Sequence, residues 1–244
     1  MEIKEQNGVR INKYLSEAGV CSRREADRQV EAGNVMIDGR TAQMGDRILP
    51  GQKVQFRGKP VIQEEEKILL AFYKPTGIVC TTEKREKNNI VDYIGYKKRI
   101  YPVGRLDKDT EGLLLITNDG ELAHRLLSPK KHVDKTYYAK VQGIVTQEDV
   151  RKFAEGVDIH EKKLTAPAVL EVVKSGEVSE ILLTICEGKF HQVKRMFEAV
   201  GKKVIYLKRL SMGPLQLDET LMPGEYRELT EKEKDTLCSV EKKQ

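Results

Sequence analysis

Long hydrophobic segments are missing from this chain of 244 residues. The longest apolar run, residues 112–116 (GLLLI), is much shorter than the roughly 20 residues that a helix needs to cross a bilayer. The first residues, MEIKE, lack the apolar core of a secretory signal peptide. We therefore expect no membrane association and a cytoplasmic location.

Cysteine and histidine are also scarce, with four of each. The cysteines form no Cys-x-x-Cys pair of the kind that binds zinc, and the histidines show no His-x-x-x-His spacing. These absences predict free thiols and no dedicated metal site. The residues concerned are Cys21, Cys80, Cys186, Cys238, His124, His132, His160 and His191.

The composition that remains is typical of a globular protein, with 39% hydrophobic and 33% charged residues. The chain is longer than one domain of roughly 100 to 150 residues, so we expect two domains or one with an appendage. Lysine and arginine (43) outnumber aspartate and glutamate (38), and the net charge of +5 permits an anionic partner without requiring one.

The N-terminal part of the chain has the pattern of a helix pair followed by short strands. Residues 22–25 (SRRE) have the capping-box form, in which the serine accepts from the glutamate amide and the glutamate reaches back, so a helix should start there. Apolar residues at helical spacing over 11–18 predict a shorter helix before it, ended by Gly19. The expected strands cover 34–40 and 53–57.

Five basic side chains belong to these helices or their caps and could line one face. Acidic residues are interleaved with them, so charge alone fits a solvated surface as well as an RNA-binding one. The five are Arg10, Lys13, Arg23, Arg24 and Arg28.

The order of residues from 9 to 56 resembles the small RNA-binding domain named after small-subunit ribosomal protein S-four. The matching segments are 10–15 (RINKYL), 19–26 (GVCSRREA) and 33–39 (GNVMIDG). The resemblance implies that the basic face binds structured RNA through its shape and its phosphates.

A proline and three consecutive glutamates mark residues 59–67 as a linker. We therefore expect an S-four-like domain over 1–58 and a larger domain over 68–244. In the larger domain helices do not alternate with strands, so we predict an α+β fold built on a mixed sheet. The expected strands cover 68–73, 112–117, 136–141, 169–173, 181–185 and 204–210, and the expected helices 119–127, 146–156 and 190–200.

The densest polar segment is residues 104–112 (GRLDKDTEG), which runs directly into an apolar strand. Rigid structure beside an acid fixes its direction, so Asp107 and Asp109 are candidates for chemistry. Two carboxylates so close also leave open a metal site or a glycosidase-like acid and base pair. An ordinary charged loop before a strand is a further alternative.

Two other segments carry candidate site residues. In the helix expected over 190–200, whose apolar stripe includes Phe190, Lys194 lies at the edge and can reach inward to a carboxylate. Arg195 points further out and fits either a surface position or a phosphate contact. In residues 135–140 (KTYYAK) the two tyrosines face opposite sides of a strand, so one can line a cleft as a stacking platform for a base.

Together these segments resemble the RsuA-type family of ribosomal RNA pseudouridine synthases, most closely its RluF branch. The resemblance runs from residue 9 to about residue 233, and residues 21–27 (CSRREAD) and the Lys-Asp pair after Asp107 favour the RluF branch. In that family GRLD carries the one indispensable acid, here Asp107. The Lys-x-Tyr segment falls on Lys135 and Tyr137, and the Gln-Val-Lys segment ends at Lys194, where the family often has arginine.

The resemblance implies isomerisation of uridine to pseudouridine in RNA with no cofactor and no metal. Asp107 would act at C1′ or C2′ of the sugar with Lys194 as its counter-ion, and Tyr137 would stack on the extruded base. The partner would be ribosomal RNA, with 23S as the first candidate, and a transfer RNA is the second candidate. We expect a monomer. A non-catalytic RNA-binding or ribosome-assembly factor and a carbohydrate hydrolase are the alternatives. The RNA contacts expected in the larger domain are Arg105, Lys135 and Arg195.

Overall fold

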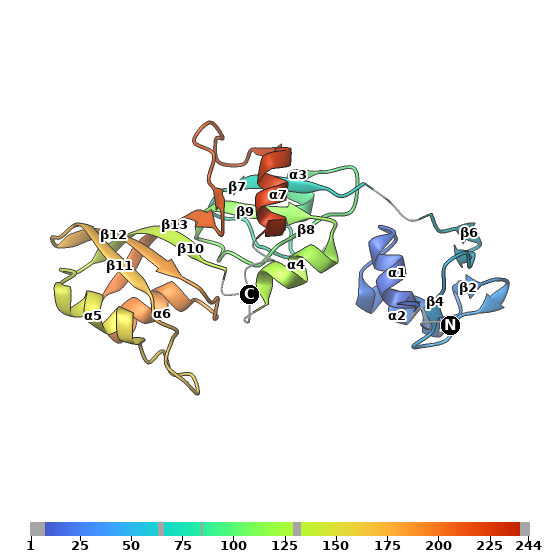
Figure 1. Ribbon diagram of the computed structural model, residues 1–244, viewed down its shortest axis with the longest axis horizontal. Helices are drawn as coiled ribbons and strands as arrows, with labels where there is room; N and C mark the ends of the chain where they lie inside the picture. The colour runs from blue at the N-terminus through green and yellow to red at the C-terminus, as the bar shows by residue number, and fades with distance from the viewer. Residues whose placement is uncertain (1–7, 63–65, 84, 129–132, 240–244) are drawn as a thin grey trace. The chain divides into compact units, whose positions relative to one another are not determined.

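The computed structural model describes residues 8–62, 66–83, 85–128 and 133–239, and the chain forms two compact units (Figure 1). The smaller unit comprises the chain up to Lys67 with Lys97–Arg99 and Asn118–Gly120, and the larger unit comprises the rest. The linker expected over 59–67 stays a prediction. Its residues Glu64 and Glu65, like the first seven residues and His132, lie outside the described part.

In the smaller unit, helices α1 (Ile11–Glu17) and α2 (Arg23–Glu31) share one apolar core with the short strands. Ser22 caps α2 by accepting from the amide of Glu25 at 3.2 Å. The expected return bond does not form, because the Glu25 carboxylate accepts instead from Arg28 (3.2 Å) and Gln29 (2.7 Å). The strands are β1 (Val9–Arg10), β2 (Val35–Ile37), β3 (Arg40–Thr41), β4 (Arg47–Ile48), β5 (Val54–Phe56) and β6 (Lys59–Pro60).

The larger unit is built on a mixed sheet in the order β11-β12-β10-β13-β9-β7-β15, with β14 on β13 and β8 on β9. The pairing of β13 with β9 is parallel, and the other neighbours in the described part of this sheet are antiparallel. The predicted α+β fold class with a mixed sheet is confirmed. The strands are β7 (Leu69–Lys74), β8 (Tyr101–Pro102), β9 (Glu111–Thr117), β10 (Lys135–Gln142), β11 (Val169–Lys174), β12 (Val178–Ile185), β13 (Lys203–Met212), β14 (Leu215–Gln216) and β15 (Tyr226–Glu228).

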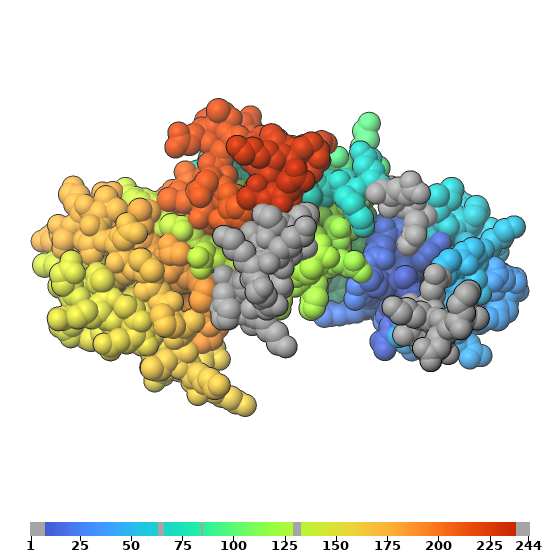
Figure 2. Space-filling view, in the orientation of Figure 1, coloured from blue at the N-terminus to red at the C-terminus, as the bar shows by residue number. Residues whose placement is uncertain are grey.

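Helices cover both faces of this sheet because successive strand residues point to opposite sides. On β7, Leu70 and Phe72 share a core with α3 (Ile90–Ile94), α5 (Gln147–Glu155) and α6 (Gln192–Ala199). The alternate residues Leu69 and Ala71 pack with α4 (Gly120–Leu127) and α7 (Glu231–Ser239). Figure 2 shows the loop between α5 and β11, in dark yellow, projecting from the larger unit, and residues 160–164 of this loop are exposed.

The helix expected over 190–200 starts later than its pattern indicates. His191 has left-handed backbone angles (φ 49°, ψ 33°), which end the helical path, so α6 begins at Gln192. Phe190 therefore lies before the helix and is 72% exposed, and its placement in the apolar stripe was wrong. The buried face of α6 consists of Gln192, Val193, Met196 and Phe197.

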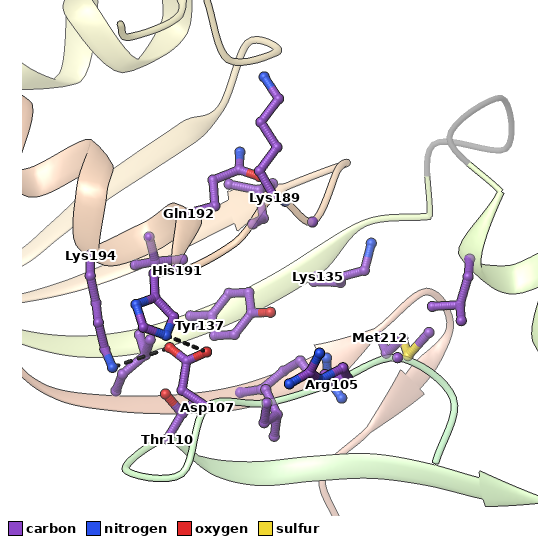
Figure 3. Close-up of a pocket in the computed structure, with 18 of the residues that line it drawn as sticks. Arg105, Asp107, Thr110, Lys135, Tyr137, Lys189, His191, Gln192, Lys194 and Met212 are labelled. Carbon is purple, nitrogen blue, oxygen red and sulfur yellow. Dashed lines mark hydrogen bonds and ion pairs between the residues drawn. The ribbon is translucent and has the colours of Figure 1, made fainter. Parts of the chain in front are cut away.

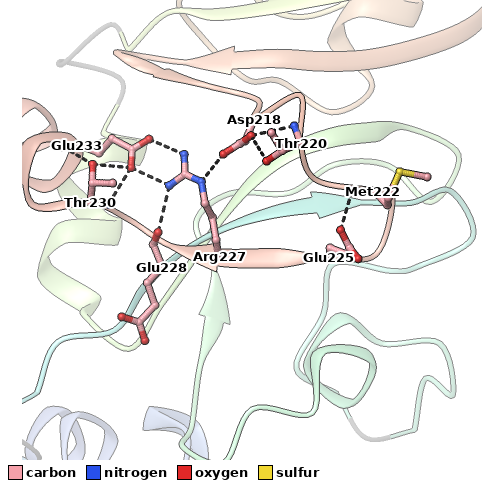
Figure 4. Close-up of polar contacts among 8 residues, drawn as sticks. All are labelled: Asp218, Thr220, Met222, Glu225, Arg227, Glu228, Thr230 and Glu233. Carbon is pink, nitrogen blue, oxygen red and sulfur yellow. Dashed lines mark hydrogen bonds and ion pairs between the residues drawn. The ribbon is translucent and has the colours of Figure 1, made fainter.

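The C-terminal elements β15 and α7 are tied together by Arg227 (Figure 4). Its Nε lies 2.5 Å from Asp218, and its Nη2 lies 2.8 Å from Glu233, which also accepts from the amide of Thr230 at the start of α7. The bond from Arg227 lowers the pKa of Glu233 to about 2.

None of the helices in the described part of the chain has the length and apolar composition needed to span a bilayer.

Candidate active site

A pocket of about 120 Å³ opens in the larger unit where the loop between β8 and β9 meets β10, β13 and the start of α6 (Figure 3). Loop, strands and helix each contribute polar side chains to it. Those that line it are Arg105, Asp107, Thr110, Lys135, Tyr137, Lys189, His191, Gln192, Lys194 and Arg209.

Lys194 is the shared counter-ion of two carboxylates. Its Nζ lies 3.1 Å from Asp107 Oδ2 and 2.6 Å from Asp109 Oδ1. Partial burial lowers the pKa of Lys194, but the hydrogen bonds to Asp109 and Asp107 outweigh it, so the pKa is raised above its usual value. The same bond lowers the pKa of Asp109. Lys194 therefore keeps its positive charge at the carboxylate of the pocket.

His191 approaches the same carboxylate from the other side. Its Nε2 lies 3.6 Å from Asp107 Oδ1, and its ring stacks on Phe190 with centroids 3.8 Å apart and an interplanar angle of 18°. The sequence placed His191 in the helix expected over 190–200, next to its apolar stripe, but gave it no role. Its position directly before the Gln-Val-Lys segment was the available signal.

A buried lysine on β7 shapes the loop that carries Asp107. Lys74 is fully buried, and its Nζ donates to the carbonyls of Pro75 (3.0 Å), Asp107 (3.0 Å) and Thr110 (2.8 Å). Burial lowers the pKa of Lys74. Because these acceptors are main-chain atoms, the contact fixes the path of the loop while the Asp107 carboxylate stays available for chemistry.

Tyr137 and Tyr138 lie on opposite faces of β10, as the alternation predicts. Tyr137 is 7% exposed and lines the pocket, with its ring between Asp107 and Lys135 in Figure 3. Tyr138 donates to Glu180 at 2.5 Å, and this bond raises its pKa to about 12. The aromatic ring available to a base in the pocket is therefore that of Tyr137.

Two further cations, Arg209 and Lys135, line the pocket. Arg209 on β13 is 2% exposed; its Nε donates to the Leu113 carbonyl at 2.7 Å, and its Nη2 has no hydrogen-bond partner among the described residues. Burial, followed by the charge of Arg209, lowers the pKa of Lys135. The sequence reasoning missed Arg209, although its alternation with Leu207 and Ser211 in an apolar strand marks it as inward-facing.

Strand β9 approaches β13 closely at Gly112. Gly112 pairs with Arg209 and has a φ of +109°. A Cβ at this position would lie 2.2 Å from the Arg209 carbonyl oxygen, so a side chain has no room. The close approach brings the loop of Asp107 next to the strand of Arg209.

The five basic residues that the sequence predicts for the RNA-binding face fall into two groups. Arg10, Lys13 and Arg23 line a concavity of about 380 Å³ together with Arg47, which the sequence reasoning missed. Arg47 lies on β4 and reaches this face because β4 pairs with β1. The other two, Arg24 and Arg28, lie on α2, are exposed and are not among the residues that line it.

Arg195 is engaged within the chain rather than pointing into the pocket. It bonds Glu161 at 2.9 Å, the Phe190 carbonyl at 3.2 Å and the Ile159 carbonyl. These bonds tie α6 to the projecting loop.

In the described ranges, no cluster of three or more His, Cys, Asp or Glu side chains could hold a metal ion.

The smaller unit presents a basic concavity, and the larger unit presents an ion-paired carboxylate beside a tyrosine ring. This combination fits an enzyme that acts on RNA. The chain belongs to the RNA pseudouridylate synthase family, whose profile matches residues 68–199, and the S4 domain profile matches residues 9–54. It is therefore an RNA pseudouridine synthase, an isomerase with RNA as its partner.

Relatives align with nearly the whole chain. The uncharacterized RNA pseudouridine synthase YtzG of Bacillus subtilis is 47% identical, covering 92% of this chain and 96% of its own length. The dual-specificity RNA pseudouridine synthase RluF of Escherichia coli is 38% identical over 93% and 77%. The ribosomal small subunit pseudouridine synthase A of Salmonella typhimurium is 39% identical over 92% and 98%. A crystal structure of a pseudouridylate synthase superposes with a TM-score of 0.69 at 34% identity, covering 94% of this chain and 100% of its own.

Proposed function

We propose that this enzyme converts one uridine of ribosomal RNA to pseudouridine with Asp107 as the reacting carboxylate. The observation that carries the proposal is the Asp107–Lys194 pair, 3.1 Å apart, in a pocket that also presents the Tyr137 ring. A lysine-paired carboxylate in front of a stacking surface suits chemistry at the sugar of an extruded nucleotide. A factor that only binds RNA has no use for this arrangement.

The reaction breaks the bond between C1′ and N1, and the electron pair leaves with the uracil ring. Asp107 either bonds to C1′ or removes the C2′ proton, and both fit a carboxylate paired with a lysine. The ring then turns on the Tyr137 face, and C5 bonds to C1′ as the bond from Asp107 to C1′ breaks or, on the other route, as Asp107 returns the proton to C2′. The C5 proton then leaves and N1 gains a proton. The product has the mass of the substrate, and the steps need neither metal nor cofactor.

Large-subunit 23S ribosomal RNA is the proposed substrate, with a transfer RNA as second candidate. The Salmonella relative is named for the small ribosomal subunit, which supports ribosomal RNA as the class. The segments 21–27 and 108–109, which resemble the RluF branch, favour the large subunit. We further propose that the enzyme acts as a monomer in the cytoplasm, and that the basic concavity of the S4 domain binds the RNA.

Mapping pseudouridines tests this function. Carbodiimide-dependent reverse-transcription stops are compared in 16S, 23S and transfer RNA from the parent strain, a deletion strain, and deletion strains that express the wild-type chain, Asp107→Asn or Asp109→Asn. We expect one stop to vanish on deletion and to return with the wild type and Asp109→Asn, but not with Asp107→Asn. Identical maps in parent and deletion strains would refute the function.

A further inference from the structure

Arg209 is a buried cation in the wall of the pocket. Only its Nε is bonded, to the Leu113 carbonyl, and no carboxylate partner is found in the described part of the chain. Burying a charge without an opposite charge is costly, and an unpartnered buried donor in a native structure calls for an explanation. Because Arg209 lines the pocket, a group of the substrate can reach it.

Lys135 extends this positive region. Its Nζ donates to the Val133 carbonyl at 2.6 Å, and the charge of Arg209 contributes to lowering its pKa. In Figure 3, the Tyr137 ring separates Lys135 from the Asp107–Lys194 pair. The pocket thus has the Asp107–Lys194 pair on one side of the Tyr137 ring and, on the other, Lys135, whose pKa responds to the charge of Arg209.

This polarity matches one stage of the proposed reaction. When the bond between C1′ and N1 breaks, the electron pair stays on uracil, and its carbonyl oxygens become negative. A base stacked on Tyr137 with C1′ toward Asp107 directs its carbonyl edge toward Lys135, which lies within reach of the charge of Arg209. Fixed, desolvated donors stabilise such developing charge more than water does.

We propose that Arg209, with Lys135, binds the carbonyl edge of the target uracil and stabilises the negative charge of the detached ring. This inference rests on the proposed function and adds a stabiliser of the leaving group to it. The enclosure of Arg209 favours the flat edge of a base over a phosphate that stays in the RNA chain. Arg105, which is exposed, suits that phosphate.

The test compares two leaving groups. The stem-loop RNA that carries the mapped uridine is synthesised with uridine or with 5-fluorouridine at that position, because fluorine makes the detached ring a weaker base. Lys135→Met, Arg209→Lys and Arg209→Met are assayed under single turnover by loss of the starting nucleoside in nuclease digests. Lys140→Met, an exposed lysine on the same strand, is the matched control. Thermal denaturation reports folding.

With uridine, we expect the Lys135→Met and Arg209→Met rates to fall about 100-fold, with Arg209→Lys in between and Lys140→Met unchanged. With 5-fluorouridine, the loss should shrink to about 10-fold, because a weaker base needs less stabilisation. Equal losses on both RNAs would overturn the inference, since positional or structural damage does not depend on the leaving group. If Arg209→Met does not fold, Lys135→Met decides. A wild-type chain that consumes no uridine would instead refute the proposed function.

Discussion

Asp107 and Asp109 share one lysine but differ in their surroundings. The Asp107 side chain is 26% exposed and lines the pocket, whereas that of Asp109 is 72% exposed. Asp107→Asn preserves shape and removes the charge, so we expect a folded protein that binds RNA and forms no pseudouridine. Asp109→Asn should retain turnover, because it leaves Lys194 to Asp107. Release of tritium from C5-labelled uridine in ribosomal RNA measures both. Tritium release by Asp107→Asn at the wild-type rate would contradict the assignment of Asp107. If chelators alone abolished release by the wild type, a metal site would have to be considered again.

Lys194 should act through its charge. Lys194→Arg retains the cation beside Asp107, so most of the turnover should remain, whereas Lys194→Met should lower the rate by about 100-fold. The raised pKa means that the ion pair is complete below the usual lysine value of about 10.4 and is lost only as the pH rises above it. The wild-type rate should therefore show no loss from this group between pH 7 and pH 10. Equal rates for all three proteins would remove the role of the ion pair.

At the scale of elements, the loop between β8 and β9 depends on Lys74 for its path. Lys74→Met keeps the length of the side chain but leaves the carbonyls of residues 75, 107 and 110 without their donor. We expect a loss of about 3 kcal/mol in the free energy of unfolding, together with reduced turnover. Urea denaturation measures the stability, and Lys108→Met, an exposed change in the same loop, is the control. Equal stability of the two variants would show that the loop holds its path without Lys74.

The C-terminal cluster around Arg227 predicts a dependence of stability on pH. The pKa of Glu233 is lowered to about 2, so its contribution is present above the usual glutamate value and is lost as the pH falls toward 2. The difference in unfolding free energy between the wild type and Arg227→Met should be full above pH 5 and shrink below pH 4. Urea titrations from pH 2.5 to pH 7 follow it. A difference that is constant over this range would exclude the ion pair as its cause.

The sequence predicts most of the helices and strands whose own residues carry a local signal. The apolar run of β9, the alternation of β10 and the cap of α5 at Thr146 are all local signals. Helix α3 is capped by Asn89 and Gly95, but with five residues it is too short for a helical periodicity to show in the sequence. Strand β15 has three residues and forms because β7 provides a pairing edge for it. The same distinction holds for the site. Asp107, Tyr137 and Lys194 lie in motifs, whereas the contacts of Lys74 and Arg209 depend on main-chain atoms far away in the sequence.

At the scale of the whole molecule, the S4 domain should supply affinity for RNA. Reversing the charges of Arg23 and Arg47 removes cations that line the basic concavity, and reversing Arg24 and Arg28 makes the same change in net charge outside it. We expect both pairs to weaken RNA binding and to reduce its salt dependence, the first pair more strongly. Filter binding of the full chains at several salt concentrations measures this. Unchanged affinity for both pairs would exclude the S4 surface as an RNA site.

Gly112 sets the spacing between strands β9 and β13. The parallel pairing of β13 with β9 covers only two residue pairs, and Gly112 with Arg209 is one of them. A side chain at position 112 would push these strands apart, and with them the loop of Asp107 and the strand of Arg209. The distance between the groups that the two strands bring to the pocket is therefore set by the absence of a side chain at this position.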